Sequence, residues 1–289
     1  MASENVAVMP DGVQIRYRLD GSSGLNAPLI VLSNPSLVDL TFWDEALALF
    51  LQNPQNTKYR ILRYDNRGRS KHNEQRRLSL DILMEDICNL LDTIKVAKAA
   101  AVIGISLGGL TAVNLALKHP ERVVAIMPCD FYPKSPPDQV EIWESRVEVA
   151  RQDKTAPVDA AGARLLGEVL AEATVKRWLA PTSVHGGISQ AKLQRVIKLV
   201  SENRLDGFIN IVHAISSYNL EKDVPECKVL ATFVAGECDD AAKYLKEMAP
   251  KYGKGVDVQI IRDAGHLPVL DQPERFTDIM TKFLEVHVV

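Results

Sequence analysis

The chain of 289 residues has few cysteines and no pattern among them. A small secreted domain held together by disulfides would need a paired cysteine framework. No C-x-x-C pair is present, and no histidine is placed to complete a zinc site with a cysteine. We therefore expect reduced thiols, a cytoplasmic location and no metal site. The four cysteines are Cys88, Cys129, Cys227 and Cys238.

The sequence also lacks an excess of positive charge. Lysine and arginine contribute 34 side chains against 37 from aspartate and glutamate, which gives a formal net charge of -3. Binding to nucleic acid requires a concentrated basic surface, and no block of like charges suggests an interaction tail. We expect a small-molecule substrate as the partner and no nucleic acid, and the sequence leaves a homodimer open.

Patterns that target or span a membrane are missing too. The first 25 residues carry several charges and no long apolar run, so we expect no signal peptide. Residues 99–117 are uncharged, but they contain several glycines and Asn114. A buried strand followed by a buried helix explains this stretch better than a membrane span. No membrane association is therefore predicted.

What remains is the composition of a globular protein, with 46% hydrophobic and 25% charged residues. Short apolar runs alternate with amphipathic stretches, and this alternation predicts an α/β fold whose parallel sheet is covered by helices on both faces. The predicted strands are residues 13–18, 29–32, 59–64, 100–104, 123–128, 228–235 and 256–261. The predicted helices between and after them are residues 80–94, 107–118 and 273–285.

Residues 134–222 differ from the rest of the chain. They contain no apolar β-branched run, and their periodicity is helical, as in Leu193, Ile197 and Val200. We predict a helical cap over residues 134–222 that lies over one end of the sheet. It would divide a core domain into two parts, residues 1–133 and residues 223–289.

The sequence Gly104-Ile105-Ser106-Leu107-Gly108 fits the pattern G-x-S-x-G between a predicted strand and a predicted helix. A serine at the apex of such a sharp turn has a strained backbone, and the glycines beside it avoid collisions. The turn exposes the hydroxyl next to a helix N-terminus, which favours negative charge. This setting predicts that Ser106 is a nucleophile. The alternative is a crossing of small residues where helix and sheet pack closely.

A serine hydroxyl needs a base, and the base needs an acid to orient it. His266 follows the last predicted strand, and Asp239 follows the strand before it. Both loops are therefore expected at one edge of the sheet, and the order Ser106, Asp239, His266 is the order that this architecture requires. Asp240 and Glu237 are alternative acids in the same loop.

These motifs resemble the α/β-hydrolase superfamily over nearly the whole chain. Within it, the sequence is similar to the 3-oxoadipate enol-lactonase-like branch. The resemblance implies an eight-stranded, mostly parallel sheet with an inserted helical cap, a Ser–His–Asp triad, and hydrolysis of an ester or lactone without a cofactor. The residues that carry the resemblance to this branch are Leu32-Ser33-Asn34 with Asp39-Leu40 and Trp43, Arg63-Tyr64-Asp65 with Arg67-Gly68, and Asp206-Gly207-Phe208 through Ala214-Ile215.

The predicted oxyanion hole departs from the pattern of the superfamily. The Leu107 amide is the expected first donor, and the resemblance puts the second donor in the loop of residues 34–36. Aligned without gaps, the donor position falls on Pro35, which has no N–H. A shift of one residue puts Asn34 or Ser36 there instead, and the side chain of Asn34 could also donate. Loss of one such donor commonly costs about 10²–10³ in rate.

We predict a serine hydrolase that cleaves a small ester or lactone through an acyl-enzyme. Ser106 would attack, His266 would accept and return the proton, and Asp239 would orient the imidazole. Pro35 leaves open another reaction on the same fold, either hydrolysis of a carbon–carbon bond or a cyclisation or acyl transfer in small-molecule metabolism. A ligand receptor on a hydrolase fold is an alternative from a different class.

Substrate selectivity is expected to depend on the cap, because the cap would cover the serine and shape the pocket. The residues predicted to line this pocket are Trp143, Trp178, His213 and Tyr218, and each has packing in the core as its alternative role. The aromatic and aliphatic content of the cap predicts a medium-sized apolar or mixed substrate and not a highly charged one.

Overall fold

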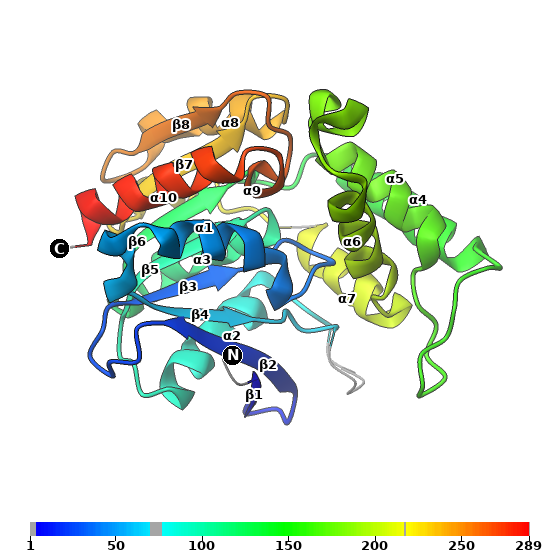
Figure 1. The fold of residues 1–289 in the computed structure, drawn as a ribbon, viewed down its shortest axis with the longest axis horizontal. Coiled ribbons are helices and arrows are strands. Elements are labelled where there is room, and N and C mark those ends of the chain that lie inside the picture. Colours follow the sequence, from blue (N-terminus) through cyan, green and yellow to red (C-terminus); the bar gives the residue numbers. More distant parts are fainter. Residues whose placement is uncertain (1–3, 70–76, 217, 289) are drawn as a thin grey trace.

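The computed structural model describes residues 4–69, 77–216 and 218–288. Within these ranges, eight strands form one sheet in the order β1-β2-β4-β3-β5-β6-β7-β8. The pairs β1–β2 and β2–β4 are antiparallel, and all other neighbouring strands are parallel. The predicted α/β-hydrolase fold with a mostly parallel eight-stranded sheet is confirmed (Figure 1). The strands are β1 (Glu4–Val8), β2 (Gln14–Gly21), β3 (Leu29–Ser33), β4 (Arg60–Tyr64), β5 (Ala99–Ile105), β6 (Val123–Cys129), β7 (Leu230–Gly236) and β8 (Asp257–Ile261).

Burial of the strands follows from their place in the sheet. All residues of β3 and β5 are buried, as expected for central parallel strands covered on both faces. The sequence analysis did not predict β1. This edge strand leaves Val6 and Val8 mostly exposed, so its burial differs from that of the central strands.

Helices cover both faces of the sheet. Helices α1 and α10 pack against each other on one face, whereas α2, α3 and α8 contribute to the core on the other. The predicted helices correspond to α2, α3 and α10, whereas α1 was not predicted. The bounds are α1 (Asp44–Gln52), α2 (Leu80–Thr93), α3 (Leu107–Lys118), α8 (Ala241–Met248), α9 (Pro268–Asp271) and α10 (Pro273–His287).

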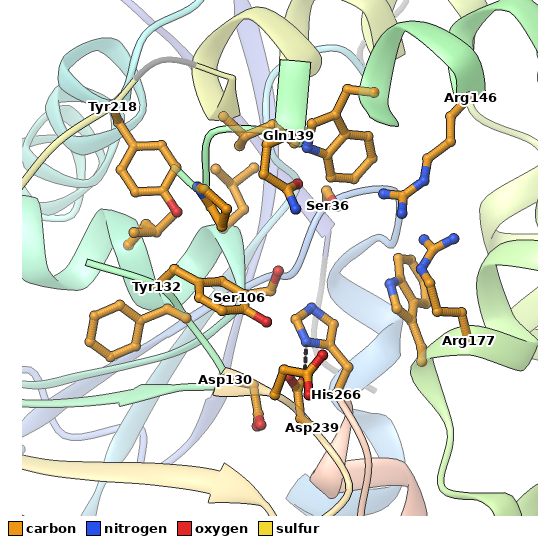
Figure 2. Close-up of a pocket in the computed structure, with 18 of the residues that line it drawn as sticks. Ser36, Ser106, Asp130, Tyr132, Gln139, Arg146, Arg177, Tyr218, Asp239 and His266 are labelled. Carbon is orange, nitrogen blue, oxygen red and sulfur yellow. Dashed lines mark hydrogen bonds and ion pairs between the residues drawn. The ribbon is translucent and has the colours of Figure 1, made fainter. Parts of the chain in front are cut away.

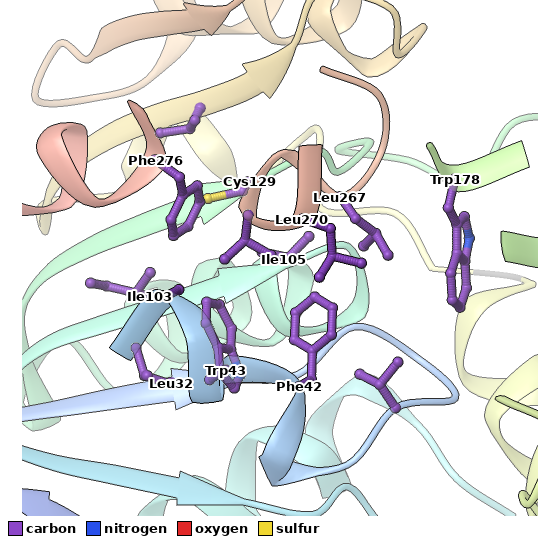
Figure 3. Packing of buried hydrophobic residues seen from close by; sticks show 14 of the residues in the cluster. Leu32, Phe42, Trp43, Ile103, Ile105, Cys129, Trp178, Leu267, Leu270 and Phe276 are labelled. Carbon is purple, nitrogen blue, oxygen red and sulfur yellow. The ribbon is translucent and has the colours of Figure 1, made fainter. Parts of the chain in front are cut away.

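Among the described residues, four further α-helices lie between β6 and β7, grouped on one side of the molecule, and we call them the inserted helices (Figure 1). Buried apolar residues join them to the sheet, as Trp178 packs in the same cluster as Leu267 and Leu270 (Figure 3). Polar contacts fix them further, since Asn203 donates through Nδ2 to the Leu37 carbonyl at 2.7 Å. The inserted helices are α4 (Gln139–Gln152), α5 (Gly167–Trp178), α6 (Gln190–Ser201) and α7 (Leu205–Ile215).

None of the helices in the described ranges is both long enough and apolar enough to cross a membrane.

Candidate active site

Ser106 occupies a tight turn between β5 and α3. Its backbone angles are φ 55° and ψ −115°, in the left-handed half of conformational space that side chains rarely adopt. Its N–H donates to the Cys129 carbonyl at 2.8 Å, which ties the turn to β6. A Cβ atom on Gly104 would lie 2.2 Å from the Gly108 carbonyl oxygen, and one on Gly108 would lie 2.1 Å from that of Ser33. The two glycines are therefore required for the close packing of this turn.

His266 and Asp239 meet at the carboxyl ends of β7 and β8. The Nδ1–H of the imidazole donates to Oδ2 of Asp239 (Figure 2). The other oxygen, Oδ1, accepts from the Ala241 amide at 2.8 Å. Among the described residues, neither Asp240 nor Glu237 bonds to the imidazole. Of the three acids that the sequence proposed, Asp239 is the one beside the histidine.

The environment of Asp239 favours its ionised form. Its side chain is only 8% exposed, and burial alone would raise its pKa. The charge and the hydrogen bond of His266 outweigh burial, so that the pKa of Asp239 lies below its ordinary value of 3.8. A carboxylate in this position stabilises a positive charge on the imidazole.

Ser106, Asp239 and His266 line one pocket of about 280 Å³ (Figure 2). The hydroxyl of Ser106 makes no hydrogen bond with any residue that the structure describes, so it is free to face a molecule in the pocket. A hydrogen bond between a catalytic serine and its base is often long or poorly aligned without substrate and tightens when substrate binds.

The loop after β3 has a different arrangement from the one that a gap-free alignment suggests. Asn34 is fully buried; its side chain donates to the Tyr64 carbonyl at 2.7 Å and accepts from the Trp43 indole at 2.7 Å. Among the described residues, the side chain of Asn34 bonds only within the core. Asn34 and Pro35 do not line the pocket, whereas Ser36 does.

Two residues that line the pocket, Leu107 and Ser36, have backbone amides with no hydrogen-bond partner among the described residues. Leu107 is the first residue of α3, where an amide has no partner within the helix. Ser36 is 5% exposed, and its N–H has no hydrogen-bond partner among the described residues. Both residues line the pocket together with Ser106.

Three of the four residues predicted to line the pocket do so, namely Trp143, Trp178 and Tyr218. The prediction for His213 is wrong. Its Nδ1 contacts Nη2 of Arg77 at 3.0 Å, and it lines a separate hollow beside α4. Ile215, two residues later on α7, faces the pocket instead. Two residues correspond to about 200° of helical rotation, which turns His213 to the opposite face.

Two arginines of the inserted helices line the pocket and were missed by the sequence analysis. Arg146 lies on α4 with its guanidinium carbon 4.4 Å from the ring centroid of Trp143, and Arg177 lies on α5. Within the described parts of the chain, neither forms an ion pair with a carboxylate. Burial, together with the charge of Arg177, lowers the pKa of Arg146 to about 10. The sequence analysis did not anticipate this positive charge in the pocket, and its expectation of an apolar or mixed substrate stays a prediction.

The spacing of these side chains offers a signal that sequence reasoning could have used. Trp143 and Arg146 are three residues apart, so they share one face of a helix. Arg177 directly precedes Trp178 at the end of α5. The sequence alone could not show that both faces turn toward the same cavity.

Asp130 also lines the pocket and was not predicted (Figure 2). It directly follows the buried strand β6, and the carboxyl ends of parallel strands are where ligand sites form. This position at a strand end could have identified Asp130 from the sequence.

Across the described residues, no cluster of three or more histidine, cysteine, aspartate or glutamate side chains could hold a metal ion.

Comparison with known proteins agrees with this geometry. Residues 39–279 match a model of the alpha/beta hydrolase family. The chain is 26% identical over 262 residues to 3-oxoadipate enol-lactonase 1 of Acinetobacter baylyi, which covers 90% of each chain. A second enol-lactonase of that organism is 21% identical over 266 residues, covering 91% of this chain and 90% of the relative. The solved enol-lactonase from Burkholderia xenovorans LB400 superimposes with a TM-score of 0.83 at 27% identity, covering 97% of this chain and all of that one.

Proposed function

The chain belongs to the alpha/beta hydrolase family, and on this premise we propose that it is a serine hydrolase of a small carboxylic ester or lactone. The observation that carries the proposal is the pair of His266 and Asp239, which shares one pocket with a serine on a strained turn. The similarity to enol-lactonases supports the choice of a lactone or ester over other hydrolysable bonds.

The proposed reaction passes through an acyl-enzyme. Ser106 attacks the acyl carbon and gives its proton to Nε2 of His266, whose imidazolium is stabilised by Asp239. The amides of Leu107 and Ser36 bind the oxyanion of the tetrahedral intermediate. His266 then protonates the leaving alkoxide, and a water molecule, activated by the same base, releases the acid product.

We also propose that residues 134–222 act as a cap domain that selects the substrate. Its helices supply Trp143 and Arg146 from α4 and Arg177 and Trp178 from α5. Among the residues that the structure describes, neither guanidinium group pairs with a carboxylate, so both bring positive charge to the pocket. Arginine binds carboxylates through paired N–H donors, so the substrate we propose carries a free carboxylate beside its ester or lactone group.

The experiment that tests the proposal is a hydrolysis assay with matched esters. Each pair shares the same acyl and leaving groups, but one member carries a carboxylate and the other a neutral amide in its place. We expect wild-type protein to hydrolyse both and to prefer the carboxylate, and Ser106→Ala to hydrolyse neither. Full activity in Ser106→Ala would overturn the proposal, and equal rates on both members would overturn the carboxylate preference.

Two other functions remain distinguishable in the same assay. Hydrolysis incorporates one oxygen from ¹⁸O-labelled water into the acid product, whereas a cyclisation or an acyl transfer to another acceptor incorporates none. A ligand receptor would bind the carboxylate ester without turnover. The second oxyanion amide that we propose is that of Ser36, which lines the pocket, in place of Pro35, which has no N–H.

A further inference from the structure

Asp130 is a buried acid beside the proposed triad that the mechanism above does not use. It follows β6 directly, in the left-handed conformation with φ 46°, and its residue surface is 1% exposed. Figure 2 shows it near Asp239, on the floor of the pocket that contains Ser106. An acid buried at this point needs a structural or chemical reason, because burying a charge without a partner is costly.

Cys129 and Asp130 together connect the end of β6 to two other strand ends. The preceding residue, Cys129, accepts the N–H of Ser106 through its carbonyl at 2.8 Å. Asp130 itself donates its backbone N–H to Val234 of β7 at 3.0 Å. Its Oδ1 accepts from the Gly236 amide at 2.9 Å. The end of β6 therefore joins the serine turn, through Cys129, to the strand that leads to Asp239, through Asp130.

Gly236 is in turn the contact point of the two loops that carry the acid and the base. A Cβ atom at Gly236 would lie 2.1 Å from the Gly265 carbonyl oxygen, so the two backbones touch there. The Gly236 carbonyl accepts from the Asp239 amide at 3.1 Å. A shift of Gly236 would therefore move both Asp239 and His266.

The surroundings of the second oxygen of Asp130 favour the uncharged form of the acid. Oδ2 is buried and has no hydrogen-bond partner, as donor or acceptor, among the described residues. The charged groups around it are Asp239 from the loop after β7 and Asp271 from α9, with the His266 imidazole beyond Asp239. Burial, reinforced by the charge of Asp239, raises the pKa of Asp130 well above its ordinary value of 3.8. A carboxylate here would have one hydrogen bond and two like charges nearby.

We propose that Asp130 is a positioning residue that works as an uncharged carboxylic acid, holding the loops of Asp239 and His266 in register with the turn of Ser106. This inference rests on the proposed serine hydrolase function. An uncharged acid accepts the Gly236 amide without placing a second negative charge beside Asp239. The role differs from that of Asp239, which must be ionised to stabilise the imidazolium.

The test compares Asp130→Asn, Asp130→Ala and Asp239→Asn by their kcat and KM for the best ester substrate. Asparagine keeps an oxygen that accepts from Gly236, so we expect its kcat to stay within about threefold of the wild type. Alanine leaves the Gly236 amide buried and unpaired, and we expect kcat to fall by roughly tenfold to a hundredfold with little change in KM. Asp239→Asn should lose about 10⁴ in kcat.

Each outcome decides one part of the inference. A loss in Asp130→Asn as large as that in Asp239→Asn would show that Asp130 acts as an anion, and would overturn the proposal. Wild-type kcat in Asp130→Ala would overturn the positioning role. The acid limb of the pH profile adds a further readout. It should coincide in wild type and Asp130→Asn, whereas removal of an ionised Asp130 would move it to lower pH.

A measurement of unfolding separates this inference from the enzyme proposal. The unfolded chain loses the Asp130 proton near pH 4, whereas the folded chain retains it to higher pH. The wild type therefore loses stability relative to Asp130→Asn as pH rises above about 4. We expect the unfolding free energy of Asp130→Asn to increase relative to that of the wild type as pH rises. This result does not depend on whether the protein hydrolyses any substrate. A difference that does not change between pH 4 and 8 would contradict an uncharged Asp130.

Discussion

The indole of Trp178 stacks on the imidazole of His266, with ring centroids 6.4 Å apart and planes inclined by 30°. Trp178 ends α5, so this contact joins the inserted helices to the loop that carries the proposed base. Aromatic pairs contribute about 0.5–1.5 kcal/mol beyond the area that they bury. The stack therefore helps to hold the imidazole at one orientation over the pocket.

Replacing Trp178 tests whether this stack matters for turnover. Trp178→Phe keeps an aromatic face, whereas Trp178→Leu keeps an apolar side chain without one. We expect kcat to remain near the wild-type value in Trp178→Phe and to fall about three- to tenfold in Trp178→Leu, corresponding to the loss of the stacking energy. Equal kcat in both variants, measured on folded protein with unchanged circular dichroism, would argue against a role for the stack.

The backbone amide of Ser36 can be tested without changing the pocket's side chains much. Ser36→Ala keeps the amide and removes only the hydroxyl, so we expect kcat close to the wild type. Ser36→Pro removes the N–H, and we expect kcat to fall by about 10²–10³. Thermal unfolding of both variants checks that the loop remains folded. A folded Ser36→Pro protein with full kcat would rule out Ser36 as the second oxyanion donor.

Arg146 and Arg177 are expected to act on substrate binding more than on the chemical step. For the carboxylate member of an ester pair, each substitution by Gln should raise KM by about 10- to 100-fold, the equivalent of a charge-assisted hydrogen bond. For the neutral member, KM should hardly change. Arg151→Gln is the matched control, because Arg151 also lies on α4 but does not line this pocket. Equal effects on both members of the pair would contradict carboxylate recognition.

The pairing of Asp239 with His266 predicts a dependence of stability on pH. The folded-state pKa of Asp239 is lowered, so its contribution to stability is present above the unfolded value near 4 and is lost as pH falls through the folded value. Asp239→Asn should therefore be less stable than the wild type at pH 7, and this deficit should shrink in acid. Each unit by which the pKa is lowered corresponds to about 1.4 kcal/mol. Chemical denaturation between pH 2.5 and 7 measures the deficit, and a constant value would contradict the pairing.

The parts of the fold and site that the sequence predicted are those encoded by local patterns. The turn at Ser106 depends on Gly104 and Gly108, whose spacing can be recognised without any tertiary information. Asp239 and His266 follow apolar strands, and parallel strands bring such loops to one edge of the sheet. The helical spacing of apolar residues predicted the helices within residues 134–222.

The features that could not be predicted from the sequence depend on the rotation of helices about their axes and on the conformation of loops. His213 and Ile215 lie on one helix, and only packing decides which of them faces the pocket. The side chain of Asn34 forms hydrogen bonds with Tyr64 and Trp43, which lie outside its own loop. Its burial in the core could therefore not be predicted from the sequence of the loop. The approach of Arg146 and Arg177 to one pocket and the burial of Asp130 could not be predicted either, because both depend on contacts between distant segments.

The most direct test of the account is to trap the acyl-enzyme. Wild-type protein is mixed with a fast chromogenic ester, quenched in acid within the first turnover, and analysed by intact mass and by peptide mapping. We predict a burst of one leaving group per chain and an added acyl mass on the peptide that contains Ser106, with neither in Ser106→Ala. Turnover without a burst or an adduct, or an adduct on another residue in the wild type, would contradict the account.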